Sequence, residues 1–142
     1  MTLVVDASVA CKWFIAEAQS QDAVAILARG DDLLAPDLIV PEVCNVAWQK
    51  LRRHEIDGDQ AAAMASGLPD MIDELVPSAR LTGRAFEIAK ALDHPVYDCL
   101  YLALAESREL RMVTADRRLL TRLRRTPWAR VAIGLGDNVA RR

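Results

Sequence analysis

Residues 3–11 read Leu-Val-Val-Asp-Ala-Ser-Val-Ala-Cys, a short apolar run that ends in an acidic residue and leads into a second apolar segment. The β-branched run at residues 3–5 predicts a buried strand. Residues 7–17 predict a helix that is apolar on nearly all sides and is therefore buried. A buried strand followed at once by a buried helix is typical of a parallel sheet covered by helices.

The rest of the chain repeats this alternation of short apolar runs and helical patterns. Further strands are predicted at residues 33–35, 75–76, 112–114 and 131–133. Helices are predicted at residues 20–29, 41–53, 81–92, 97–109 and 116–125, and another from Asp57 or Asp59 toward Leu75 with a break at Gly67 and Pro69. We therefore expect one α/β domain over residues 1–142, with a central parallel sheet covered on both faces.

The helix predicted at residues 97–109 has an apolar stripe at helical spacing. Its members are Tyr97, Leu100, Tyr101 and Leu104. Residues three and four apart lie on one side of a helix, so this stripe is expected to face the core.

Basic side chains gather toward the C-terminal part of the chain. Residues 108–142 hold ten basic and three acidic residues, whereas residues 1–107 hold eight and seventeen. A basic region suits a polyanionic partner, and a solvated helix face explains it equally well. The N-terminus has no positive segment, and no apolar run is long enough to span a membrane. We expect no signal peptide, no membrane contact and a cytoplasmic location.

Four carboxylates lie where a parallel sheet places its functional groups. Asp6 ends the first predicted strand, and Asp116 follows the strand at 112–114. Glu42 and Asp98 each lie in the first turn of a predicted helix. Functional sites gather at the carboxyl ends of parallel strands, so these four side chains are expected to meet there. Each also has a structural alternative, because Asp at a helix start often caps the helix.

A cluster of carboxylates has a clear chemical use. The like charges repel one another unless a cation binds between them or their pKa values rise. Hard oxygen ligands favour Mg²⁺ or Mn²⁺, which can orient and activate water for attack on a phosphodiester. Other catalytic patterns are weak, because the chain holds only His54 and His94 and lacks HExxH, Walker A and GxSxG motifs.

Four segments resemble, in order, the acidic motifs of PIN-domain proteins, and most closely the toxins of bacterial VapBC-type toxin–antitoxin pairs. They are residues 5–14 around Asp6, residues 41–45 around Glu42, residues 96–105 around Asp98, and residues 113–116 ending in Asp116. The resemblance implies a three-layer α/β/α fold and an endoribonuclease that depends on Mg²⁺, with Mn²⁺ as a substitute. It places the metal ligands and catalytic carboxylates at these four positions.

The resemblance also implies supporting residues and partners. Ser8, Asn45 and Thr114 match small polar positions beside the carboxylates, and Ser8 is equally well explained as a helix cap. Such toxins form homodimers and are neutralised by a small antitoxin whose Arg or Lys reaches the acidic site. If the substrate is RNA, the basic helix after Asp116 can hold its backbone through Arg117, Arg118 and Arg122.

Two other functions compete with the nuclease. A phosphatase of the haloacid dehalogenase type also begins with a strand that ends in Asp, but it needs a second Asp where this chain has Ser8. A non-catalytic binding module would use the acidic cluster to dock a basic partner, for instance as a co-repressor with an antitoxin. An Asp6→Asn or Asp98→Asn variant separates catalysis from binding.

Overall fold

A computed structural model of the protein describes residues 1–137. At its centre is a five-stranded sheet in which every neighbouring pair is parallel, with strand order β3-β2-β1-β4-β5. The strands are β1 Thr2–Val5, β2 Asp32–Pro36, β3 Glu74–Val76, β4 Arg111–Thr114 and β5 Ala132–Gly134. The predicted α/β class with a central parallel sheet is confirmed.

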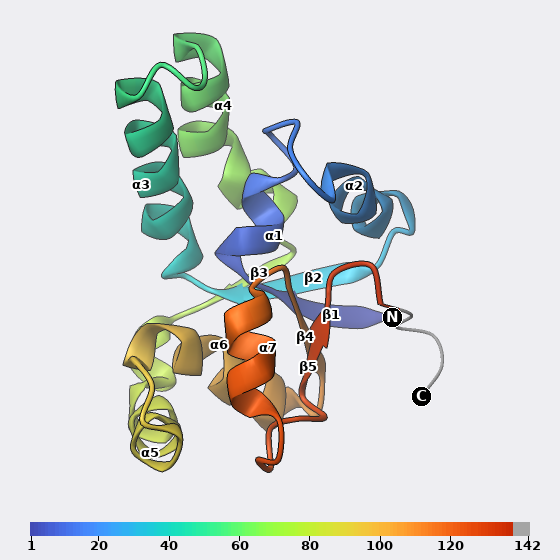
Figure 1. Ribbon diagram of the computed structural model, residues 1–142, viewed down its shortest axis with the longest axis vertical. Helices are drawn as coiled ribbons and strands as arrows, with labels where there is room; N and C mark the ends of the chain where they lie inside the picture. Colours follow the sequence, from blue (N-terminus) through green and yellow to red (C-terminus); the bar gives the residue numbers. More distant parts are fainter. Residues whose placement is uncertain (138–142) are drawn as a thin grey trace.

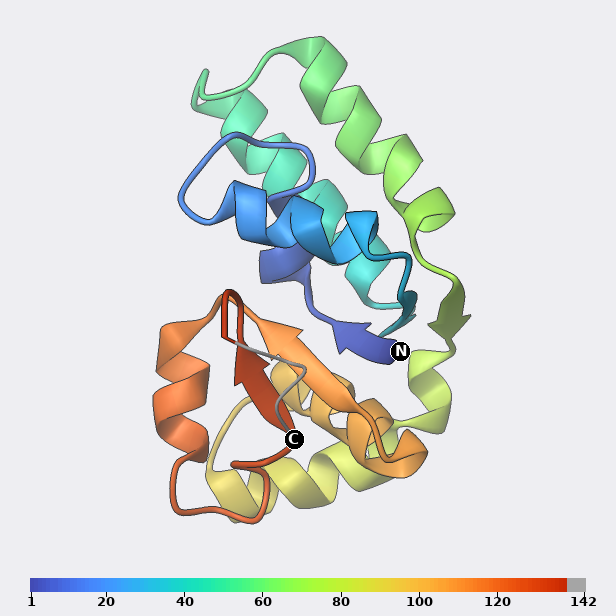
Figure 2. The same cartoon turned by 90° about the vertical axis from the view of Figure 1, so that its right-hand side faces the viewer.

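Within residues 1–137, seven α-helices cover this sheet. They are α1 Ala7–Cys11, α2 Ser20–Ala28, α3 Ile39–Arg52, α4 Gly58–Gly67, α5 Thr82–Leu92, α6 Val96–Arg108 and α7 Arg117–Leu123, with 3₁₀ turns η1 Leu68–Met71 and η2 Ser78–Arg80. Helices α1 to α4 lie on one side of the sheet, and α5, α6 and α7 lie on the other (Figure 1, Figure 2). The arrangement has the expected three layers. None of the helices within residues 1–137 is long and apolar enough to cross a membrane.

The central strand β1 sets the position of the site. Leu3, Val4 and Val5 are at most 1% exposed, because β2 and β4 pair with β1 on either side and helices cover both faces. Val5 pairs with Val113 of β4. The residues that follow these two strands therefore leave the sheet side by side at its carboxyl edge.

Helix α1 is much shorter than predicted. The sequence predicts a helix over residues 7–17, but α1 ends at Cys11 and a turn follows. Hydrogen bonds from beyond the helix hold the turn: Lys12 Nζ donates to Ala18 O (2.8 Å), and Trp13 Nε1 donates to Ala23 O (3.0 Å). These bonds replace the helical pattern that local apolar spacing favours.

The helix α6 is buried on all sides in its middle and exposed at its start. Residues Cys99–Ala105 are all buried between the sheet and α5. Tyr97 was predicted to face the core, and that prediction is wrong, because 65% of Tyr97 is exposed. The residues of the first turn of α6 are partly or largely exposed, so helical spacing alone does not say which positions a neighbouring element covers.

Helix boundaries elsewhere agree with the sequence patterns to within one or two residues. Asp57 caps α4 through a capping box with Gln60, and α4 ends at Gly67 as expected. Asp93 ends α5 in the left-handed conformation (φ 51°), and Pro95 begins α6. This short connection turns the chain back so that α5 and α6 pack against each other.

Candidate active site

Asp6 lies at the carboxyl edge of the sheet, in the first position after β1. It is buried, with 8% of its surface exposed. Its Oδ1 accepts hydrogen bonds from Ser8 Oγ (2.5 Å) and Val9 N (3.1 Å), and its Oδ2 accepts one from Thr114 Oγ1 (2.5 Å). Asp6 is therefore the N-cap of α1, as the structural alternative proposed. The cap uses Oδ1, so it does not consume the whole carboxylate.

Ser8 and Thr114 hold Asp6 in one orientation. The Ser8 hydroxyl accepts from Ala115 N (2.9 Å), and the Thr114 hydroxyl accepts from Asp116 N (3.0 Å). With those acceptor roles filled, both hydroxyl protons point to Asp6. A carboxylate oxygen has two lone pairs. Oδ1 has both occupied, and Oδ2 keeps one for a ligand.

Burial makes the charged form of Asp6 unfavourable. It raises the pKa of Asp6 to about 6, against the opposing effect of hydrogen bonds from Ser8, Thr114 and Val9. The negative charge of Asp98 adds to the rise. Among residues 1–137 no Lys or Arg pairs with Asp6, so no basic side chain there offsets the cost of its charge.

Glu42 is held beside the same edge by a buried tyrosine. Tyr101 donates its hydroxyl proton to Glu42 Oε1 at 2.5 Å, and only 1% of Tyr101 is exposed. Burial raises the pKa of Glu42, the Tyr101 hydrogen bond lowers it, and Asp6 and Asp98 raise it further. Burial, followed by the Glu42 charge, also raises the pKa of Tyr101 far above its usual range. Sequence patterns identified Tyr101 as a core residue and gave no sign of this second role.

Asp98 is held by a histidine of the preceding loop. His94 Nε2 lies 2.6 Å from Asp98 Oδ2, within one helical turn of it in sequence. The His94 backbone N–H donates to Ala89 O (3.2 Å), so the ring is carried on an anchored loop. The i, i+4 spacing of the two residues was visible in the sequence, but only the loop geometry places the ring against the carboxylate.

Asp116 is linked to Asp6 by a hydrogen bond through Thr114. Its charge is not among the causes that shift the pKa values of Asp6 and Glu42. Its Oδ1 accepts from Arg118 N (3.0 Å) and Leu119 N (3.1 Å), so Asp116 caps α7. Asp6, Glu42 and Asp98 form the electrostatic centre, since Asp6 and Asp98 both raise the pKa of Glu42. Asp116 lies at its rim, with its backbone N–H on the hydroxyl that holds Asp6.

The donor set fits a hard divalent cation in charge and ligand type. Within residues 1–137, neither Lys nor Arg pairs with any of the four carboxylates. In the same residues no three acidic, His or Cys side chains converge closely enough to form a complete metal cage. Mg²⁺ does not require one, because it keeps several waters and often binds through one or two carboxylates. The free lone pair of Asp6 Oδ2 suits that mode of binding.

The three arginines predicted to bind RNA differ in whether their side chains already hydrogen-bond other parts of the protein. Arg122 donates from Nε (3.1 Å) and Nη2 (2.7 Å) to Leu92 O, and from Nη2 to Asp93 O (2.9 Å). Arg122 therefore ties α7 to the end of α5 and has a structural role that the sequence did not indicate. Arg117 and Arg118 are mostly exposed, and they line an open hollow of about 590 Å³ together with Thr121 and Arg122.

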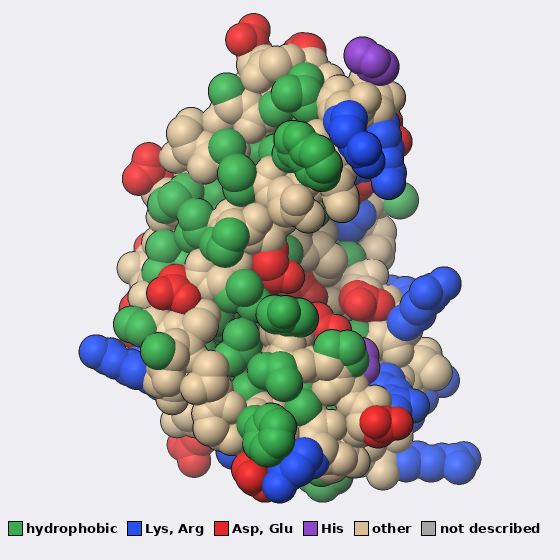
Figure 3. Space-filling model, turned by 90° about the vertical axis from the view of Figure 1, so that its left-hand side faces the viewer, with side chains coloured by type: hydrophobic (Ala, Val, Ile, Leu, Met, Phe, Trp, Pro, Cys, Tyr) green, Lys and Arg blue, Asp and Glu red, His purple; other side chains and the backbone are tan. Residues whose placement is uncertain are grey.

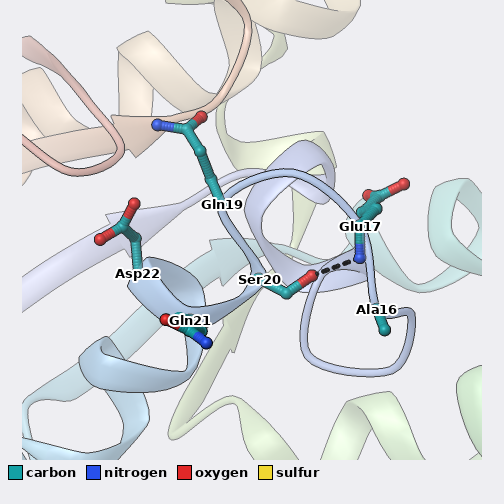
Figure 4. Close-up of a pocket in the computed structure, with 6 residues that line it drawn as sticks. All are labelled: Ala16, Glu17, Gln19, Ser20, Gln21 and Asp22. Carbon is teal, nitrogen blue, oxygen red and sulfur yellow. Dashed lines mark hydrogen bonds between the residues drawn. The ribbon is translucent and has the colours of Figure 1, made fainter.

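Another hollow, of about 550 Å³, lies at the loop before α2 and the first turn of that helix, and none of the four candidate carboxylates lines it (Figure 4). Ser20 Oγ accepts from Glu17 N (2.8 Å) and donates to Ile15 O (2.7 Å), while Gln19 Nε2 donates to Leu135 O (2.9 Å). These hydrogen bonds hold the loop to itself and to the residue that follows β5, and no chemistry is assigned to this hollow.

Comparison with known proteins gives consistent results. The family model described as "PIN domain" matches residues 3–126. The chain is 35% identical over 121 residues to Ribonuclease VapC3 of Pyrobaculum aerophilum, covering 84% of this chain and 92% of the relative. It is 36% identical over 87 residues to Ribonuclease VapC1 of Mycobacterium tuberculosis, covering 60% and 63%. The fold resembles the crystal structure of PAE2754 from Pyrobaculum aerophilum, with a TM-score of 0.68, 24% identity, and 96% and 85% of the two chains covered.

Proposed function

Because this chain belongs to the PIN-domain family, we propose that it is a Mg²⁺-dependent endoribonuclease, the toxin of a toxin–antitoxin pair. The observation that carries the proposal is a buried Asp6 whose oriented carboxylate has a free lone pair, a raised pKa and no basic partner among residues 1–137. A carboxylate built in this way is suited to a cation. The whole chain, residues 1–142, is proposed to be one PIN domain that acts in the cytoplasm.

Three of the four proposed metal-site carboxylates have a side chain that orients them. Ser8 and Thr114 hold Asp6, Tyr101 holds Glu42, and His94 holds Asp98. We propose that Asp6 and Asp98 bind the ion, and that Glu42 and Asp116 complete its surroundings, directly or through water.

When bound, Mg²⁺ or Mn²⁺ supplies charge for the phosphate and a water of lowered pKa. Asp6 and Asp98 would hold the ion, and its positive charge would compensate the repulsion among the four carboxylates. Arg117 and Arg118 attract the RNA backbone toward this edge. Asn45 lies about one turn after Glu42 on the same side of α3. We propose that it stabilises the arrangement of the metal site without binding the metal itself.

The phosphatase alternative has no support in the geometry. It requires Asp6 to act as a nucleophile with a second acid two residues later, but Ser8 stands there and donates to Asp6. Three donors converge on the Asp6 carboxylate, which lowers its nucleophilicity.

Exposed apolar side chains on the face formed by α3, α4 and α5 support the proposed protein partners. Figure 3 looks onto α3, α4 and α5, where apolar side chains line the face and acidic side chains gather between them. Trp48 and Leu51 of α3 are 55% and 40% exposed. Exposed apolar patches mark interfaces. We propose that they serve a homodimer, and that an antitoxin places an Arg or Lys on the carboxylates.

The test is cleavage of purified cellular RNA by wild-type protein and by the Asp98→Asn variant, with Mg²⁺ and with excess EDTA. Asp59→Asn is the matched control, since it removes an exposed carboxylate on α4. Cleavage that needs metal, vanishes in Asp98→Asn and persists in Asp59→Asn supports the proposal. Cleavage that survives EDTA refutes the metal mechanism, and a wild-type protein that cleaves no RNA in any of these conditions supports the binding module.

A further inference from the structure

A hollow of about 330 Å³ adjoins the carboxylates, and of its lining residues the mechanism above uses only Glu42 and Asn45. It is lined by Leu38, Pro41, Glu42, Asn45 and Tyr97. Helix α3 and the residue before it contribute one wall, and the exposed Tyr97 ring of α6 contributes the other. Its size lies at the lower end of the range of about 300–1,000 Å³ that is typical of small-molecule pockets.

The lining has the chemistry of a site for a flat, neutral ring with a polar edge. Tyr97 offers an aromatic face, and Pro41 and Leu38 offer apolar surface. Asn45 brings an amide with both donors and acceptors, and within residues 1–137 it has no hydrogen-bond partner of its own. The lining has no Lys or Arg, so a phosphate is not its ligand.

The position of the hollow relates it to the proposed reaction. Glu42 belongs both to this lining and to the carboxylate cluster, and Tyr97 directly precedes Asp98. A molecule bound here therefore lies next to the proposed site of cleavage. In single-stranded RNA, each phosphate joins two riboses, and the base that each ribose carries is free to leave the stack and pack on an aromatic side chain.

We propose that Tyr97, Pro41 and Asn45 form a binding site for one unstacked base of a single-stranded RNA substrate, beside the scissile phosphate. The proposal rests on the proposed ribonuclease function and adds the substrate class and a specificity residue. Tyr97 supplies stacking, which every base accepts. Asn45 contacts the edge of the base and distinguishes one base from another.

The test measures RNA affinity separately from cleavage. Short single-stranded oligonucleotides are titrated against protein in which Asp98→Asn prevents turnover, alone and combined with Tyr97→Leu, Tyr97→Phe or Asn45→Ala. Phe86→Leu is the matched control, because Phe86 is an exposed aromatic of α5 (55% exposed) outside the hollow. We expect Tyr97→Leu to weaken binding about 5- to 100-fold and Tyr97→Phe to retain it.

Asn45→Ala is expected to reduce the differences in affinity among oligonucleotides of the four bases, with little change for the weakest. Sedimentation of each variant reports its oligomeric state. Unchanged RNA affinity in Tyr97→Leu overturns the proposal. So does a loss of affinity accompanied by dissociation of a dimer, which would make this face an interface between two copies.

These results are distinguishable from failure of the ribonuclease function. RNA that binds through Tyr97 to a wild-type protein that does not cut it supports the base site and refutes the nuclease. Cleavage by the wild type with the same affinity and base preference in every variant supports the nuclease and refutes the base site.

Discussion

The Asp6→Asn variant is expected to be more stable than the wild type at neutral pH when metal is absent. Burial raises the pKa of Asp6 from 3.8 to about 6. Between these values the folded protein binds more protons than the unfolded chain, so the free energy of unfolding falls as pH rises. Each pKa unit corresponds to about 1.4 kcal/mol, and the charged Asp6 therefore destabilises the fold by about 3 kcal/mol above pH 6.

The amide keeps the shape of the side chain and removes this charge. Its oxygen can accept from Ser8 and Val9, and its nitrogen can donate to the Thr114 hydroxyl. The Thr114 proton must then turn toward Ser8 Oγ, 3.4 Å away, a loss of about 1 kcal/mol. We expect a net gain of about 2 kcal/mol at pH 7.5.

Urea unfolding in EDTA at pH 7.5 and pH 4 measures this difference. The advantage of the variant over the wild type is expected to shrink by about 2.4 kcal/mol between pH 7.5 and pH 4, because Asp6 of the folded wild type is protonated and neutral at pH 4. Asp59→Asn should show no such change, because its carboxylate is exposed. Saturating Mg²⁺, at about 100 times its Kd, should stabilise the wild type by about 2.7 kcal/mol. A difference in unfolding free energy between variant and wild type that does not change with pH would refute the claim that the buried charge of Asp6 destabilises the fold.

Four further variants test the support of Glu42, the two roles of the basic helix and the left-handed end of α6. Tyr101→Phe removes the donor to Glu42, and calorimetry should find Mg²⁺ affinity reduced about 10-fold or more, whereas unaltered affinity would show that Glu42 needs no such support. Arg122→Gln should lower the free energy of unfolding by about 1–2 kcal/mol and leave the salt dependence of RNA binding unchanged, because Arg122 bonds carbonyls of α5. Arg118→Gln should leave the free energy of unfolding nearly unchanged and reduce the slope of log RNA affinity against log salt concentration by about 0.7. Glu109→Gly, at an exposed left-handed position (φ 55°), should stabilise the protein by about 0.5–1 kcal/mol in thermal unfolding, and a destabilised variant would contradict the strain there.

The sequence predicted the edge of the sheet where the carboxylates gather, because strands show as apolar runs and parallel strands direct their carboxyl ends to one side. Asp6 and Asp116 follow from that rule, whereas Thr114 was predicted from the resemblance to the PIN-domain family. It could not predict the contact between Tyr101 and Glu42, which joins residues 59 apart in the chain. Nor could it predict that Tyr97 is exposed, since helical spacing identifies a stripe but does not say where the covering layer ends.

Local sequence patterns also could not predict the structural role of Arg122 in the basic helix. Local composition marks α7 as basic, but only the packing of α7 against the end of α5 shows that Arg122 bonds backbone carbonyls. The short α1 has a similar cause, because hydrogen bonds to residues beyond the helix end it. In each case a contact between distant residues decides what a local pattern leaves open.

The most direct measurement of the metal-dependent mechanism compares Mg²⁺ binding with RNA cleavage in one buffer at pH 7.5. Calorimetry gives the Mg²⁺ concentration that half-saturates the wild type, and a fluorogenic single-stranded RNA gives the concentration that half-saturates cleavage. We predict that the two concentrations agree and that Asp98→Asn loses both binding and cleavage. Cleavage that proceeds in EDTA, or that remains in Asp98→Asn after its Mg²⁺ binding is lost, would contradict a carboxylate-held metal as the catalytic centre.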